Sequence, residues 1–141
     1  MPSFLLHRRV HRASALCLGA FAVVHIGNHL TGLRGIEAHL AFMQAARVIY
    51  RHPAAEALLL ASAALQAWSG VTLLSRSRLR NAANPVIALQ HWSGAYLGFF
   101  LLVHVAAVLV GRGFLSLDTT WYFAAAGLHV GPFAWFFAPY Y

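Results

Sequence analysis

The sequence predicts an all-α integral membrane protein, a helical bundle forming a single transmembrane domain over residues 1–141. The first observation is composition, because 60% of the residues are hydrophobic and only 9% are charged. The mean hydropathy of +0.65 is too high for a soluble domain of this size. The second observation is a set of long apolar runs bordered by arginines. The third is that the chain resembles itself at an offset of 79 residues.

Three apolar runs are about as long as a bilayer is thick, and each is expected to form a spanning helix. They cover residues 13–33, 54–74 and 85–110. A cluster of three arginines precedes the first run and another follows the second, so both clusters fall on one side of the membrane. Because arginine-rich ends stay in the cytoplasm, we expect a cytoplasmic N-terminus in a bacterial inner membrane. Topology thus explains the net charge of +7, which does not indicate a nucleic-acid partner.

Between the first two runs, residues 34–52 predict a short lateral helix that lies along the membrane interface and ends before Pro53. A helix packed against neighbouring protein is the alternative interpretation. The expected apolar stripe follows helical spacing. It consists of Ile36, Leu40, Met43, Ala46 and Tyr50.

When the chain is shifted by 79 positions, it matches itself without a gap at several glycine, histidine, serine and proline positions. The pairs include Ser14/Ser93, Gly19/Gly98, Phe21/Phe100, His25/His104, Gly32/Gly111 and Pro53/Pro132. This pattern predicts two tandem copies, residues 12–75 and 91–141, of a unit made of a spanning, a lateral and a second spanning helix. The fourth span would then begin near residue 133, whereas the sequence ends at Tyr141. We therefore expect an incomplete last helix, either truncated or completed by a partner.

His25 and His104 are the candidate metal ligands. His25 lies 13 residues after Arg12, and His104 lies 13 residues after His91. At 1.5 Å per residue, each histidine is roughly 20 Å from the cytoplasmic end of its helix. The two helices run parallel in the predicted topology, so the two histidines should lie at similar depth. Two facing imidazoles inside a bundle are what a b-type haem requires for its axial positions.

Two further residue pairs accompany these histidines in the two copies. Gly19 and Gly98 would either leave room for a flat macrocycle or allow close helix packing. Arg34 and Arg112 follow the histidines near the outer boundary of the membrane. A guanidinium there would either bind a haem propionate or serve topology by snorkelling to the interface.

The segment HRASA at residues 11–15 resembles the His-Arg-x-Ser/Thr-Gly opening of the cytochrome b anchors of succinate dehydrogenase and fumarate reductase. Residues 90–109, QHWSGAYLGFFLLVHVAAVL, resemble a second such helix. In dihaem members of that superfamily, histidines from the two halves ligate the haems in pairs. The resemblance implies that His25 and His104 form one such pair. The second apolar run has no histidine, so the resemblance does not extend to a second haem.

The resemblance also implies a quinone site. Its candidate residues are Arg12, Ser14 and His91. Two departures bear on that site, since Ala15 replaces the usual glycine and Arg8 stands where a serine often does. The lipid bilayer is the first expected partner, followed by another membrane or redox subunit or a second copy of the chain.

Because bis-histidine iron has no open position, the predicted function is electron transfer. The chain would be a b-type cytochrome-like subunit between quinone and a partner redox protein, at most a non-catalytic subunit of an oxidoreductase. One alternative is a haem-free anchor or small-molecule carrier with structural histidines. A second is a membrane di-metal oxygenase, because His25 and His29 form an HxxxH pair. We expect His11 to be solvated and His39 and His52 to have ordinary surface roles, and we assign no role to His129.

Overall fold

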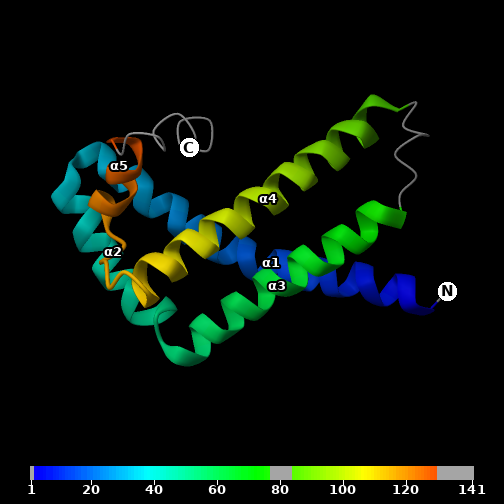
Figure 1. Ribbon diagram of the computed structural model, residues 1–141, viewed down its shortest axis with the longest axis horizontal. Coiled ribbons are helices and arrows are strands. Elements are labelled where there is room, and N and C mark those ends of the chain that lie inside the picture. The colour runs from blue at the N-terminus through cyan, green and yellow to red at the C-terminus, as the bar shows by residue number, and fades with distance from the viewer. Residues whose placement is uncertain (1, 77–83, 130–141) are drawn as a thin grey trace.

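The computed structural model describes residues 2–76 and 84–129, and every regular element in that part of the chain is helical. The helices α1, α2 and α3 are followed by α4 and α5, and the short 3₁₀ turn η1 lies between α1 and α2 (Figure 1). Their bounds are α1 Pro2–Thr31, η1 Gly32–Arg34, α2 Ile36–Tyr50, α3 Pro53–Arg76, α4 Pro85–Gly113 and α5 Trp121–His129.

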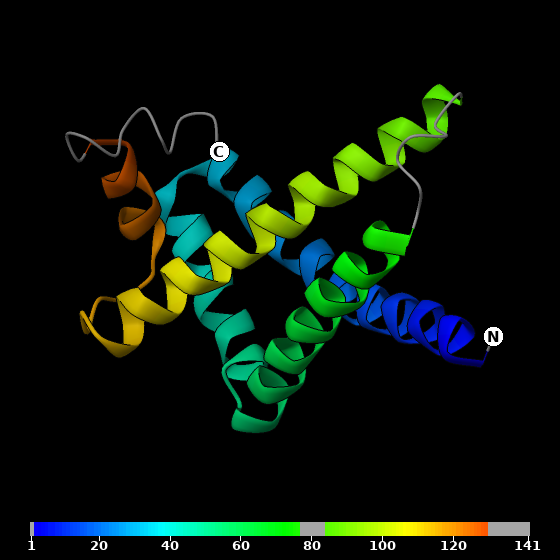
Figure 2. The same cartoon turned by 45° about the vertical axis from the view of Figure 1, so that its right-hand side comes forward.

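Three stretches are long and apolar enough to cross a membrane, namely Leu5–Arg34, Pro53–Ser75 and Pro85–Gly113. The prediction of an all-helical fold with three helices that could span a membrane is therefore confirmed for the described residues. α1 and α4 run in the same direction, while α3 runs in the opposite one (Figures 1 and 2). The first helix begins earlier than the apolar run predicted, so Arg8, Arg9 and Arg12 lie on α1 itself.

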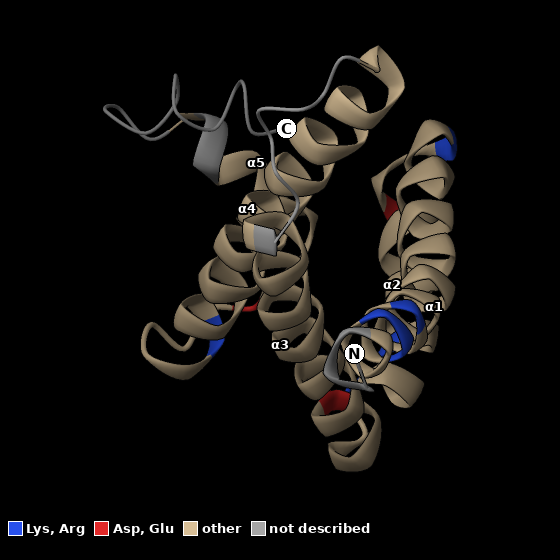
Figure 3. Ribbon diagram, turned by 90° about the vertical axis from the view of Figure 1, so that its right-hand side faces the viewer, with Lys and Arg blue, Asp and Glu red and all other residues tan. Residues whose placement is uncertain are grey.

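The interior of the bundle is polar and its surface is apolar. Among the described residues, the buried hydrophobic side chains are Met43 and Ala63, whereas large aliphatic and aromatic side chains are exposed along α1, α3 and α4. Charged residues are sparse along the helices (Figure 3). Small and polar side chains let membrane helices approach closely while apolar ones face lipid, so this distribution suits a bilayer. The buried polar residues are Ser14, Asn28, His39, Ser62 and Ser69.

α2 is the predicted lateral helix, and it joins the end of α1 to the start of α3 (Figure 1). Gly35, at φ 115°, makes the turn into it, a conformation that favours glycine. Of the predicted apolar stripe, Met43 is buried and Leu40, Ala46 and Tyr50 are half-buried, whereas Ile36 is 40% exposed. The stripe did not include His39, which is also buried on α2. Arg47 follows at the same spacing of four. The inward face of α2 is thus partly polar, which agrees with the alternative of packing against neighbouring protein.

α5 lies against two glycines at the ends of α1 and α4. A Cβ on Gly32 would stand 3.2 Å from the ring of Trp121, and one on Gly111 would stand 2.9 Å from the ring of Phe123. Gly32 and Gly111 are equivalent in the 79-residue offset. The tandem repeat itself remains a prediction, because Pro132 and the expected start of a fourth span lie outside the described residues.

Candidate functional site

The rings of His25 and His104 lie side by side, contributed by α1 and α4. Their centroids are 5.9 Å apart and their planes are inclined by 72°. Both side chains are half-buried. The two histidines that sequence spacing placed at one depth are thus neighbours in space, although they are 79 positions apart.

Each of these histidines stacks on a phenylalanine one turn earlier in its helix. The Phe21–His25 centroids are 5.5 Å apart at 20°, and the Phe100–His104 centroids are 5.5 Å apart at 14°. A four-residue spacing puts both rings on one face of a helix, where stacking restricts the imidazole's rotamers. The same local arrangement therefore occurs in both halves of the chain.

His29 and His39 extend the pair into a histidine row, which we define as His104, His25, His29 and His39. The Nε2 atoms of His25 and His29 are 3.3 Å apart. The ring of His29 lies 5.4 Å from that of His39 on α2. The row connects α4 to α1 and α1 to the lateral helix.

Asn28 fixes the inner end of the row. His39 donates its Nδ1 proton to the Asn28 carbonyl oxygen at 3.0 Å, and its Nε2 accepts from the Asn28 amide at 3.4 Å. Both ring nitrogens of His39 thus have a partner on Asn28, and only 2% of His39 is exposed. The surface role expected for His39 is wrong. The available signal was its helical spacing, since His39 lies four residues before Met43 and eight before Arg47, on a face of α2 that need not be apolar.

The glycines expected beside the histidines have no close neighbour. No atom outside their own helix backbone lies within 4 Å of a Cβ built on Gly19 or Gly98. Close helix packing is therefore not seen at either position. A separation of six residues also rotates each glycine about 120° away from its histidine, so the two do not share a helix face. Room for a macrocycle at these glycines remains a prediction.

The three candidate quinone residues, Arg12, Ser14 and His91, make no hydrogen bonds to one another among the described residues. Arg12 is exposed, while Ser14 is 4% exposed and donates to Gln66 Oε1 on α3 at 2.6 Å. In the described part of the chain, no hydrogen bond or ring contact joins His91 to either of them, and its Nδ1 atom is buried without a partner.

His11 belongs to the same contact between α1 and α3 as Ser14. Its Nε2 accepts from Gln66 Nε2 at 3.2 Å, and its Nδ1 donates to Ser69 Oγ at 3.0 Å. The expectation that His11 is solvated is wrong. We call His11, Ser14, Gln66 and Ser69 the neutral network, because its members join two helices without an ion pair.

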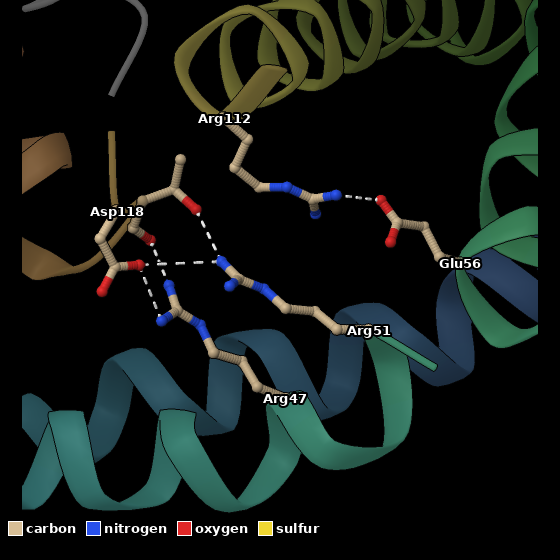
Figure 4. Close-up of polar contacts among 6 residues, drawn as sticks. Arg47, Arg51, Glu56, Arg112 and Asp118 are labelled. Atoms are coloured by element: carbon tan, nitrogen blue, oxygen red, sulfur yellow. Dashed lines mark hydrogen bonds and ion pairs between the residues drawn. The ribbon is translucent and has the colours of Figure 1, made fainter. Parts of the chain in front are cut away.

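A second polar group lies at the far ends of α1 and α4 and was not predicted. Arg47 Nη1 lies 2.9 Å from Asp118 Oδ1, and Arg47 Nη2 donates to the Thr119 carbonyl at 2.9 Å (Figure 4). Arg51 Nη2 donates to Thr119 Oγ1 at 3.1 Å. Arg112 Nη2 pairs with Glu56 Oε1 at 2.5 Å. We call Arg47, Arg51, Arg112, Glu56 and Asp118 the outer arginine cluster.

The outer arginine cluster bears on the prediction that Arg34 and Arg112 would bind haem propionates. Arg112 already has Glu56 as its partner, and Arg34 is exposed. Burial lowers the pKa of Arg51, and the like charges of Arg47 and Arg112 lower it further, against the opposing effects of Tyr50 and Asp118. Arg47 and the Thr119 carbonyl to which it donates are 72 residues apart in sequence, so local pattern could not reveal the cluster.

Within residues 2–76 and 84–129, no group of three or more histidine, cysteine, aspartate or glutamate side chains is arranged to hold a metal ion. A bis-histidine haem needs only two such side chains from the protein. Neither the known protein families, nor the characterised proteins, nor the solved structures include one to which this chain is significantly similar.

Proposed function

We propose that the chain is a membrane-embedded, b-type cytochrome-like subunit in which His25 and His104 ligate one haem. The supporting observation is the 5.9 Å separation of the two imidazole centroids. With metal–nitrogen bonds of about 2 Å, two imidazoles on opposite sides of one ion have ring centres roughly 6 Å apart. His25 and His104 are therefore the residues that would hold a haem iron, which would supply one-electron transfer.

The surrounding residues also suit this assignment. His25 and His104 come from different helices, so a flat group could be held between them, and Phe21 and Phe100 stack on them to limit their rotation. The exposed aliphatic surface of α1 and α4 would face lipid and keep water from the two rings. One adjustment is required, because the His25 Nε2 atom must exchange its contact with His29 for the metal.

When bound, a bis-histidine haem supplies one-electron transfer without an open coordination position. The protein's own part would be to hold the two imidazoles at fixed depth and to insulate them from water. Quinone and a partner redox protein are the proposed exchange partners, as in the succinate dehydrogenase and fumarate reductase anchors. We also propose that the N-terminus is cytoplasmic, in a bacterial inner membrane, and that a membrane or redox subunit or a second copy completes the assembly.

The test is a haem titration of the full chain in mild detergent, followed by absorption and electron paramagnetic resonance spectra. We expect His25→Ala and His104→Ala each to abolish the low-spin haem signal. His52→Ala and His129→Ala are matched controls, because both side chains are exposed and distant from the pair in sequence. Both controls should keep the signal.

His29→Ala separates the two possible ligands on α1, because the Nε2 atoms of His25 and His29 are neighbours. The proposal requires that this variant keep a low-spin signal. Loss of the signal in His29→Ala together with its retention in His25→Ala would assign the ligand to His29. A wild-type protein that never binds haem would contradict the proposal as a whole.

A haem-free anchor or carrier is the second candidate, and one observation favours it. The histidine row already provides ring nitrogens with hydrogen-bond partners, since His25 contacts His29 and His39 contacts Asn28. Such contacts reduce the cost of imidazoles in a membrane without any metal. The same titration decides between the candidates, because the anchor should give no low-spin haem signal at any haem concentration.

A further inference from the structure

The outer arginine cluster holds more positive than negative charge. Arg47, Arg51 and Arg112 face only two carboxylates, those of Glu56 and Asp118. Arg47 and Arg51 are four residues apart on α2 and its C-cap, a spacing at which like charges repel. Both point at one carboxylate, Asp118, which lies 2.9 Å from Arg47 and 3.9 Å from Arg51 (Figure 4).

The guanidinium groups of this cluster also have unused donors. The Nε atoms of Arg47 and Arg51 are buried and have no hydrogen-bond partner in the described part of the chain. Only 13% of the Arg47 side chain and 32% of the Arg51 side chain are exposed. A guanidinium carries five N–H donors in a planar arrangement. Two of them can donate at once to two oxygens of a phosphate group. Burial lowers the pKa of Arg51, and the neighbouring positive charges of Arg47 and Arg112 lower it further.

Asp118 is the exposed member of the cluster. Its side chain is 63% exposed, and it lies on the loop between α4 and α5. Because two guanidiniums share a single carboxylate, the positive charge there is not fully neutralised and would attract a second anion. That anion would compete with Asp118 for the two guanidiniums. The cluster lies at the end of the three apolar helices, where the phosphates of a bilayer would lie.

We infer that Arg47 and Arg51 form a phosphate-binding site, occupied by the phosphodiester of an anionic phospholipid headgroup. Inorganic phosphate shares this chemistry. Asp118 acts as an internal competitor that occupies the two guanidiniums when no lipid is present. The site is separate from the histidine pair, so its existence does not depend on haem binding.

The experiment measures thermal unfolding of the full chain in neutral detergent while phosphatidylglycerol, phosphatidylcholine or inorganic phosphate is added. We expect phosphatidylglycerol to raise Tm and phosphatidylcholine to have a much smaller effect. Arg51→Gln should weaken phosphatidylglycerol binding about tenfold, as expected when one charge-assisted hydrogen-bonding group is removed. Arg34→Gln is the matched control, because Arg34 is exposed near the same end of the bundle and lies outside the cluster.

Asp118→Asn distinguishes a binding site from a purely structural cluster. Removing the internal competitor should strengthen phosphatidylglycerol binding, even though the loss of an ion pair lowers Tm in the absence of lipid. A lipid response that is equal for the two phospholipids, or one that Asp118→Asn weakens as much as Arg51→Gln does, would overturn the inference. Stabilisation by inorganic phosphate but not by phosphatidylglycerol would overturn the lipid as the source of the phosphate group.

Discussion

The two ends of the bundle hold arginines in different surroundings. The end where α1 begins carries Arg8, Arg9 and Arg12, all exposed. Arg76 ends α3, and Arg78 and Arg80 follow it in sequence. The opposite end carries the other four arginines together with all three acidic residues of the chain. Arginines of the first kind can serve as topology signals, whereas three of the second kind, Arg47, Arg51 and Arg112, are held by ion pairs within the structure.

The two ends also join their helices by different interactions. At the α1 start, the neutral network connects α1 to α3 through His11, Ser14, Gln66 and Ser69. At the opposite end, ion pairs connect α2 to the α4–α5 loop and α3 to α4. Neutral hydrogen bonds function within a bilayer without the cost of burying charge. The ion pairs lie near the membrane surface, where water and lipid headgroups can solvate the charges and so lower the free-energy cost of burying them.

The largest expected effect is on orientation in the membrane. If the acid-free arginines hold their end in the cytoplasm, replacing all six of them by glutamine should invert or scramble the protein. Replacing the four arginines of the other end should leave the orientation unchanged. Labelling of a cysteine introduced at each end with a membrane-impermeant maleimide, in a Cys17→Ser background, measures the outcome. Unchanged labelling in the first variant would show that arginine content does not set the topology.

The second expected effect separates the two kinds of connection by stability and salt dependence. Glu56→Gln leaves Arg112 without its carboxylate and should cost about 1–2 kcal/mol, less than for a fully buried pair because the two side chains are 32% and 26% exposed. Gln66→Leu removes neutral hydrogen bonds and should cost about 1 kcal/mol. Denaturant titrations in detergent at low and high salt provide both values.

Salt is the control for this comparison. Screening weakens an ion pair near the surface, so the cost of Glu56→Gln should shrink at high salt while that of Gln66→Leu stays constant. A double-mutant cycle with Arg112→Gln should recover most of the Glu56→Gln cost as coupling. Equal salt dependence in the two variants would mean that the two ends do not differ as described.

Sequence reasoning reached the parts of this molecule that depend on short-range spacing. The spanning helices follow from apolar length, and the proximity of His25 and His104 follows from equal depth in parallel helices. It missed His39, because α2 was expected to lie along the membrane interface with only apolar residues on its buried face. It also missed the pairing of Arg47 with Asp118, because such a contact depends on how the α4–α5 loop folds back over α2. Haem and quinone binding remain predictions.

The smallest expected effect concerns α5, which covers one end of the bundle only. An added methyl at Gly111 would meet the Phe123 ring at 2.9 Å, so Gly111→Ala must displace that ring. Overpacking costs about 1–3 kcal/mol, and the better helix propensity of alanine returns about 1 kcal/mol, so a net loss of about 1 kcal/mol is expected. Gly98→Ala on the same helix has open space and should be neutral or slightly stabilising. Thermal unfolding in detergent measures both variants, and because Phe123 is the obstacle, Phe123→Leu should relieve the loss in Gly111→Ala. If Phe123→Leu gives no relief, α5 does not rest on Gly111 through that ring.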